Sequence, residues 1–341
     1  MPESKVRLPL NLALQGGGSH GAFTWGVLDA LLEDGRFALD GISGTSAGAM
    51  NAVAVAQGFA LAANQSKDRE EIHSQGCALA RETLRTLWEG VGRLGAMLWG
   101  VPLPGNPLVG MMSQWFSPYQ TNPLDINPLR KLLRETVDFA LLHAEHGQVP
   151  KVFVCATNVR TGRGEIFSGK QLSIDSVMAS ACLPMMFQAV KVGEDHYWDG
   201  GYSGNPALYP LIYHTECSDV LLVQINPVQH RAVPENASDI VDRINEVTFN
   251  ASLLAELRAI AFVRRLLREG KLDPKRYKDV RVHRIDGGEV LAPFGAASKS
   301  RADTLFLRQL FQLGREEGKR WLHQHHHDVG VRCSVESADD V

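Results

Sequence analysis

The sequence lacks three features that would assign it to a specialised class of protein. No run approaches the ~18 consecutive apolar residues of a membrane-spanning helix, and the short apolar run after Arg7 breaks at Gly16, which argues against a secretory signal. The five cysteines are odd in number and form no C-x-x-C pair, which favours a reducing compartment over a disulfide framework or a cysteine zinc site. The net charge is only −3, so we expect no nucleic-acid partner. These absences predict a cytoplasmic protein without a membrane span.

Segments with the pattern of strands alternate along the chain with segments that have the pattern of helices. With 341 residues, of which 44% are hydrophobic, the chain is long enough for a large core in one or two domains. The alternation predicts an α/β fold with a mainly parallel sheet. The expected strands are residues 8–14, 152–157 and 220–225, with hairpins near 164–167 and 190–198, and the expected helices are residues 22–33, 47–56, 122–142, 174–180, 249–268 and 302–322.

A short stretch from Gly44 to Gly48 places Ser46 in a G-x-S-x-G spacing. A strand precedes it and a helix of small residues follows, which predicts a nucleophile elbow with the serine oxygen beside a helix N-terminus. The flanking glycines suit a sharp turn in which backbones approach closely. The alternative is a glycine-rich turn with no chemistry.

A glycine-rich stretch, Gly16-Gly17-Gly18-Ser19-His20-Gly21, connects the first expected strand to the first expected helix. Such a turn aims backbone N–H groups at an anion. The same letters fit G-x-G-x-x-G, which makes a dinucleotide site the first rival. That site needs an acidic residue at the end of the second strand, whereas Asp40 precedes the strand. A third interpretation is that the glycines only allow close packing.

A serine nucleophile needs a group that takes its proton and donors that hold the oxyanion. No histidine stands at a clear strand end well downstream of Ser46, but Asp199 does, followed by Gly200 and Gly201. A carboxylate can act as the base if it comes within hydrogen-bond distance of the serine. The glycines at 16–18 could supply the oxyanion hole. The alternative for Asp199 is a turn aspartate, since Asp-Gly is a common turn pair.

Residues 84–118 form an apolar insertion that glycines and prolines interrupt. It could line an acyl-chain pocket or form its lid, or it could simply pack on the core. The candidate substrate-binding residues in it are Trp99, Met111, Met112 and Trp115. A basic stretch over residues 258–284 could touch an anionic membrane surface, with a solvated helix face as the alternative.

Three motifs, taken together and in this order, resemble the patatin-like phospholipase family: residues 16–21, 44–48 and 199–201. The stretches at 179–184 and 205–206 resemble it too. The resemblance covers residues 8–230, which we expect to be the catalytic domain, with residues 231–341 as a helical C-terminal extension packed on it.

The resemblance implies a three-layer α/β/α sandwich and a lipid acyl hydrolase of the phospholipase A or lysophospholipase type. In it Ser46 is the nucleophile, Asp199 the general base and residues 16–18 the oxyanion hole, with Gly21 among the motif glycines. The reaction passes through an acyl-enzyme and needs no metal or cofactor.

One departure from the family is His20, where the family usually has Arg or Lys. It leaves the choice between phospholipid, neutral lipid and thioester open. An esterase or thioesterase acting on other acyl substrates, and a catalytically silent module that binds lipid or a partner, stay as alternatives. The sequence predicts no oligomeric state.

Overall fold

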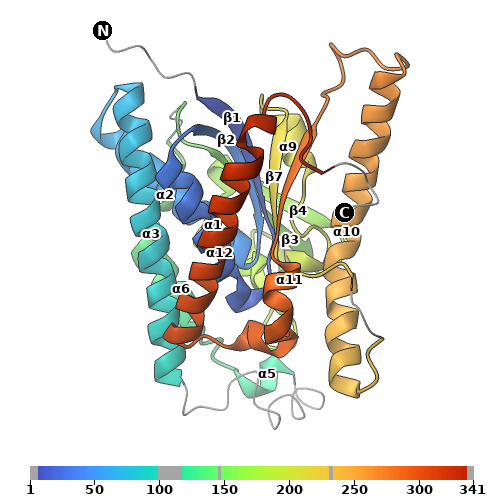
Figure 1. The fold of residues 1–341 in the computed structure, drawn as a ribbon. Helices are drawn as coiled ribbons and strands as arrows, with labels where there is room; N and C mark the ends of the chain where they lie inside the picture. The colour runs from blue at the N-terminus through green and yellow to red at the C-terminus, as the bar shows by residue number, and fades with distance from the viewer. Residues whose placement is uncertain (1–6, 99–116, 145–146, 230–232, 336–341) are drawn as a thin grey trace.

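A mainly parallel sheet of eight strands forms the centre of the molecule (Figure 1). The computed structural model describes residues 7–98, 117–144, 147–229 and 233–335. The strand order is β5-β6-β3-β2-β1-β7-β8, with β4 also paired to β3. The five strands from β3 to β8 along this order are parallel, whereas the pairings of β3 with β4, of β3 with β6 and of β5 with β6 are antiparallel. The strands are β1 (Leu8–Leu14), β2 (Phe37–Thr45), β3 (Lys151–Asn158), β4 (Gly164–Ser168), β5 (Val190–Val192), β6 (Asp195–Asp199), β7 (Asp219–Gln224) and β8 (Arg281–Asp286).

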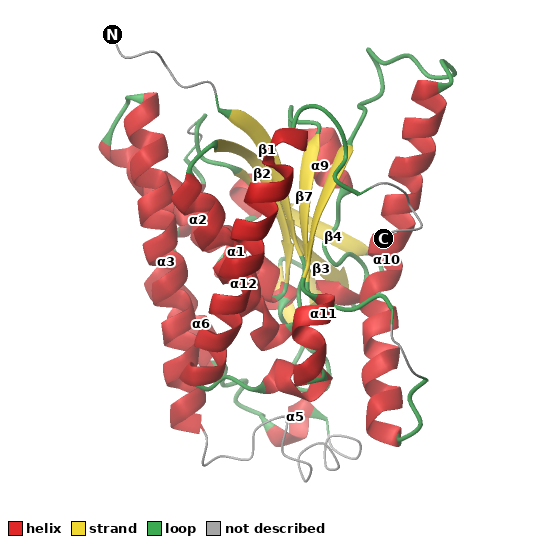
Figure 2. Cartoon of the chain, viewed as in Figure 1, coloured by secondary structure: helices red, strands yellow, loops and turns green. Residues whose placement is uncertain are grey.

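Helices cover both faces of this sheet (Figure 2). On one face lie α1 (Gly21–Asp34), α2 (Ala47–Gln65), α3 (Arg69–Leu98) and α12 (Thr304–His325), and the other face carries α9 (Tyr209–His214) and α10 (Ala237–Arg268). The shorter helices are α5 (Pro118–Thr121), α6 (Pro128–Thr136), α7 (Phe139–Leu142), α8 (Ile174–Ser180) and α11 (Gly288–Leu291). None of the described helices is long and apolar enough to cross a membrane.

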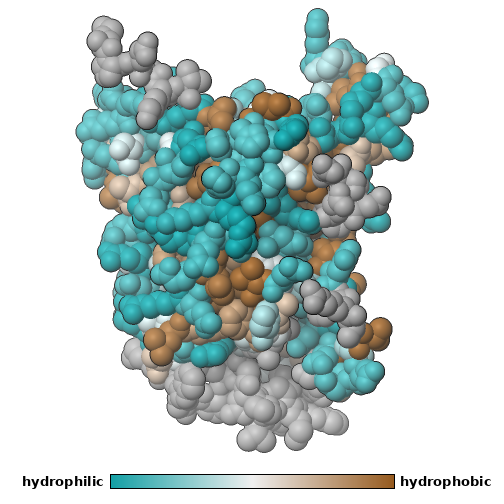
Figure 3. Space-filling view, viewed as in Figure 1, coloured by the Kyte–Doolittle hydropathy of each residue, from teal (hydrophilic) through white to brown (hydrophobic). Residues whose placement is uncertain are grey.

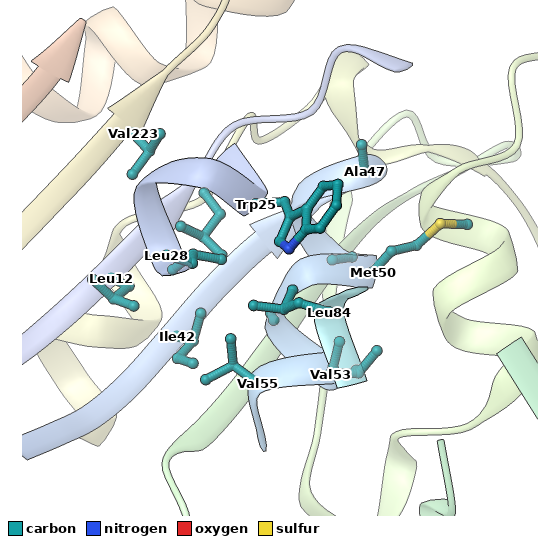
Figure 4. Close-up of a cluster of buried hydrophobic side chains, with 14 of the residues drawn as sticks. Leu12, Trp25, Leu28, Ile42, Ala47, Met50, Val53, Val55, Leu84 and Val223 are labelled. Carbon is teal, nitrogen blue, oxygen red and sulfur yellow. The ribbon is translucent and has the colours of Figure 1, made fainter. Parts of the chain in front are cut away.

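Alternate side chains of the central strands enter two separate cores. Leu12 and Leu14 of β1 join the core under α1, α2 and α3, part of which Figure 4 shows. Ala13, between them, joins the second core, where Leu253 and Leu257 of α10 pack. Because successive strand residues point to opposite faces, the sheet is buried on both sides. The expected three-layer α/β/α sandwich is therefore confirmed.

Helices α1 and α12 approach each other closely although they lie far apart in the sequence. A Cβ added to Gly26 of α1 would lie 2.0 Å from the carbonyl oxygen of Phe311, and one added to Gly314 of α12 would lie 1.9 Å from that of Phe23. The ring of Trp25 packs at a tilt against that of Phe311, with ring centroids 4.1 Å apart. Each helix thus contributes a glycine, whose lack of a side chain allows the backbone of the other helix to pack against it.

The apolar insertion expected over residues 84–118 is partly an ordinary helix. Residues up to 98 continue α3 as one helix of 30 residues. Trp88 is buried in the core and donates from Nε1 to Oδ1 of Asn51 at 2.8 Å. For this part the core interpretation is correct. The four candidate substrate-binding residues, Trp99, Met111, Met112 and Trp115, lie outside the described residues.

Three further expectations differ from the structure. The helix expected over residues 122–142 is divided into α6 and α7, because the chain is extended at Val137 and Asp138 caps a new helix start. Helix α10 begins at Ala237 rather than near residue 249, with Asn236 as its N-cap. The C-terminal part is not only helical, since β8 pairs with β7 in the central sheet. The domain boundary near residue 230 stays a prediction.

Candidate active site

Ser46 lies at the sharp turn between β2 and α2, with backbone angles φ 55° and ψ −121°. This strained conformation is typical of a nucleophile elbow. A Cβ added to Gly44 would lie 2.4 Å from the carbonyl oxygen of Gly48, and one added to Gly48 would lie 2.1 Å from that of Leu14. The turn therefore closes only with glycines at both positions, which gives the G-x-S-x-G spacing its physical reason.

Asp199 reaches the same edge of the sheet from a different strand. It ends β6 and pairs with Ala156 of β3, whose neighbour Cys155 pairs with Thr45 of β2. A Cβ added to Gly200 would lie 2.1 Å from the carbonyl oxygen of Cys155 and 3.0 Å from Cγ2 of Thr45. The turn that follows Asp199 thus packs directly against the residue before Ser46.

The carboxyl group of Asp199 is completely buried. Burial raises its pKa from the ordinary 3.8 to about 7, against the opposing effects of a hydrogen bond from the Gly201 N–H (2.7 Å to Oδ1) and of the Ser46 hydroxyl. The second oxygen, Oδ2, has no well-aligned hydrogen bond within the described residues. Asp199 is thus a carboxyl that changes protonation near neutral pH and has a free lone pair, as a general base requires.

Gly16 is fixed between the elbow and two buried amides. A Cβ added to it would lie 2.7 Å from Cβ of Ser46. Its N–H donates to Oδ1 of Asn205 at 2.7 Å, and its carbonyl oxygen accepts from Nδ2 of Asn226 at 2.7 Å. The N–H groups of Gly17 and Gly18 make no hydrogen bond to any described residue. Of the three glycines expected to hold an oxyanion, Gly17 and Gly18 therefore have N–H groups to offer, and Gly16 does not.

His20 is a neutral, structural side chain. Its Nε2 is 2.7 Å from Oγ of Ser298. Burial, and then the nearby charge of Lys299, lowers the pKa of His20 to about 3. The imidazole therefore carries no positive charge at neutral pH. Gly21, the last glycine of the motif, has its Cα so close to α2 that an added Cβ would lie 2.6 Å from Cβ of Ala47.

Several residues that support the site were not assigned a role from the sequence. Oγ of Ser180 accepts from the Ser46 N–H at 2.9 Å, and Asn205 holds Gly16. Both fall in stretches whose resemblance to the family was the only signal. Asn226 and Lys299, 2.9 Å apart through Oδ1 and Nζ, carried no signal, because they meet the glycine-rich loop only in the folded chain.

Other possible sites offer less chemistry. A cavity of about 610 Å³ contains neither Ser46 nor Asp199 among its lining residues. Arg36 and Arg81 in its wall are already paired with Asp34 and Asp29. Within the described ranges, no cluster of His, Cys, Asp and Glu could hold a metal ion. At the edge of the sheet, by contrast, the Ser46 hydroxyl lies beside the buried Asp199 carboxyl, near the Gly17 and Gly18 N–H groups that have no partner among the described residues.

Comparison with known proteins gives a family match. The family model described as patatin-like phospholipase matches residues 12–212. Among solved structures, the crystal structure of VipD from Legionella pneumophila is similar, with a TM-score of 0.40 and 16% sequence identity, over 94% of this chain and 67% of that chain. No curated protein sequence matches this chain significantly.

Proposed function

Since this chain belongs to the patatin-like phospholipase family, we propose that it is a serine lipid acyl hydrolase that cleaves fatty-acyl ester bonds with Ser46 and Asp199. The observation that carries the proposal is the meeting of Ser46, on a strained elbow, with a buried Asp199 whose pKa is about 7. The unused N–H groups of Gly17 and Gly18 support it. The substrates are of the phospholipase A or lysophospholipase type, and no metal takes part.

The reaction runs in two halves. In the first, Asp199 takes the proton of Ser46 while Oγ attacks the acyl carbon, and the N–H groups of Gly17 and Gly18 hold the oxyanion. The intermediate collapses, and the alcohol leaves with the proton returned by Asp199. In the second half Asp199 takes a proton from water as the water attacks the acyl-enzyme; the intermediate then collapses, Asp199 returns the proton to Ser46 Oγ, and the fatty acid leaves.

Contact with a lipid surface is part of the proposal. Four large apolar side chains on the first turns of α10 are exposed: Ile240, Val241, Ile244 and Val247. Figure 3 shows the lower end of α10 as mainly hydrophilic in this view, with a small hydrophobic patch at its outer edge. The next turn of the helix lies at the site, because Phe249 packs edge-on against Tyr202 with centroids 5.1 Å apart. An apolar helix face beside the site suits a substrate drawn from a micelle or bilayer.

A labelling experiment tests the nucleophile. A fluorophosphonate probe is expected to label the wild type and the surface control Ser74→Ala, and to leave Ser46→Ala unlabelled. Hydrolysis should fall by about 10⁴–10⁶-fold in Ser46→Ala, the cost of losing a serine nucleophile. Label retained on Ser46→Ala would refute the assignment, and no label on the wild type would favour a silent binding module.

A substrate panel tests the rest. Phosphatidylcholine vesicles, lysophospholipid, triacylglycerol, a soluble short-chain ester and an acyl thioester cover the open choices. We expect lipid esters to be preferred, and activity to rise when the substrate forms aggregates. A preference for the soluble ester or thioester would favour the esterase alternative. Equal activity on dispersed and aggregated lipid would contradict the contact with a lipid surface, but it would not contradict the hydrolase activity.

A further inference from the structure

Lys299 is a cation that lies behind the glycine-rich loop and takes no part in the mechanism above. It belongs to the short helix η5 (Ala296–Ser300). The carbonyl oxygen of Lys299 covers the loop so closely that a Cβ added to Gly18 would lie 2.3 Å from it. Its side chain is only 21% exposed, and Nζ donates to Oδ1 of Asn226 at 2.9 Å.

The hydrogen bonds continue from Lys299 to the oxyanion donors. Asn226 is itself buried, and its Nδ2 donates to the carbonyl oxygen of Gly16 at 2.7 Å. That carbonyl belongs to the same peptide group as the Gly17 N–H, which has no partner among the described residues. Hydrogen bonds in such a chain polarise one another. A donor to the carbonyl end of a peptide makes its N–H end more positive.

Two acidic neighbours favour the charged form of Lys299, against the effect of its burial. Glu246 lies 3.8 Å from Nζ of Lys299, and Glu246 and Asp242 oppose the effect of burial, which lowers the pKa of Lys299. His20, on the other side, is neutral at pH 7. Nζ of Lys299 is the cationic group that donates directly to Oδ1 of Asn226.

We propose that Lys299 is a positioning residue. Through Asn226 and the Gly16–Gly17 peptide, it makes the Gly17 N–H a stronger donor to the oxyanion. This inference rests on the proposed function of Ser46. Negative charge develops on the substrate oxygen only in the transition state, so Lys299 should act on kcat and hardly on KM. Losing one direct oxyanion donor costs about 10²–10³ in kcat. Because Lys299 acts through an intervening amide, its removal should lower kcat by less, about 10-fold.

The experiment compares three substitutions on a soluble short-chain ester. Lys299→Met and Lys299→Gln should both lower kcat about 10-fold with KM within about 2-fold. Lys299→Gln keeps a donor for Asn226 without the charge, and it carries the test if Lys299→Met does not fold. Lys299→Arg should recover part of the loss. Lys278→Met is the matched control, because that lysine donates to the carbonyls of Thr215 and Cys217 at the other end of β7, and its kcat should not change.

Two readouts separate a charge relay from a merely structural role. An alkyl trifluoromethyl ketone, which forms an oxyanion on Ser46, should bind about 10-fold more weakly to Lys299→Met, in parallel with kcat. In an Asn226→Ala background, Lys299→Met should not lower kcat further, because the hydrogen bonds that connect Lys299 to the Gly16 carbonyl are already lost.

The possible outcomes distinguish this inference from the proposed function. An unchanged kcat in Lys299→Gln, an unchanged inhibitor constant, or an equal loss in the Asn226→Ala background would overturn the relay while fluorophosphonate labelling of Ser46 persists. If Ser46 of the wild type is not labelled, both proposals fall together.

Discussion

Replacing Asp199 by Asn should abolish the base and yet make the folded protein more stable at alkaline pH. Asn has almost the shape of Asp, and its Oδ1 can still accept from the Gly201 N–H. The buried carboxylate, however, loses its hydration, which is why the pKa of Asp199 rises from 3.8 to about 7. A neutral amide at the same place avoids that cost.

The sign and size of the effect follow from linkage. Between pH 4 and pH 7 the folded protein holds a proton on Asp199 that the unfolded chain has lost, so the wild type loses stability as the pH rises through this window. The difference between 3.8 and about 7 corresponds to an upper limit of about 4 kcal/mol in the free energy of unfolding. The gain of Asp199→Asn should therefore be absent below pH 4 and complete above pH 7.

Urea unfolding of both proteins at pH 5 and pH 8 measures this gain. Asp195→Asn, on the same strand, is the control. The Asp195 side chain is only partly buried and pairs with Arg160, so its loss should cost no more than about 1 kcal/mol. If Asp199→Asn were less stable than the wild type at pH 8, or if its gain were the same at both pH values, burial of a carboxylate would not be the origin of the raised pKa.

Two further predictions concern activity and the turn. The kcat/KM of the wild type should rise about 10-fold per pH unit below pH 7 and level off above it, since only ionised Asp199 can take the proton; a profile that is flat between pH 5 and pH 8 would exclude Asp199 as the base. Gly48→Ala should lower the melting temperature strongly, because its Cβ would lie 2.1 Å from the Leu14 carbonyl oxygen, whereas Gly147→Ala, with nothing within 4 Å, should change it little.

The elbow and the sheet could be predicted because short-range rules determine them. Gly44 and Gly48 are needed for the close approach that the turn imposes, so their spacing in the sequence already carries the information. Leu12 and Leu14 enclose the apolar Ala13, and apolar residues at successive positions are typical of a strand buried on both faces. The same rules indicated Asp199, which ends a strand and precedes two glycines.

The helices with glycines were harder to predict. Gly92 and Gly95 suggested an irregular segment, yet both lie inside α3. An added Cβ would lie 2.9 Å from Oγ1 of Thr304 at Gly92 and 2.2 Å from the carbonyl oxygen of Ala302 at Gly95. Because these glycines have no side chain, α3 can pack closely against a segment that lies more than 200 residues away in the sequence. A local pattern cannot distinguish this use of glycine from a helix break.

The residues that support the glycine-rich loop could not be predicted for a related reason. Asn226 and Lys299 are an ordinary asparagine after a strand and an ordinary lysine in a short polar stretch. Their role depends on the positions of Gly16 and Gly18, which only the folded sheet brings near them. By contrast, His20 stood in the motif itself, and only the structure shows it to be neutral and held by Ser298.

The packing of α12 on α1 has a consequence for the order in which the protein becomes active during synthesis. Ser46 and Asp199 leave the ribosome well before η5 and α12, which cover Gly18 and the glycine face of α1. A growing chain that already carries both of these side chains still lacks the segment that packs against Gly18 of the glycine-rich loop. We expect it to be inactive until η5 and α12 have docked, so that synthesis of this segment controls when hydrolysis can begin.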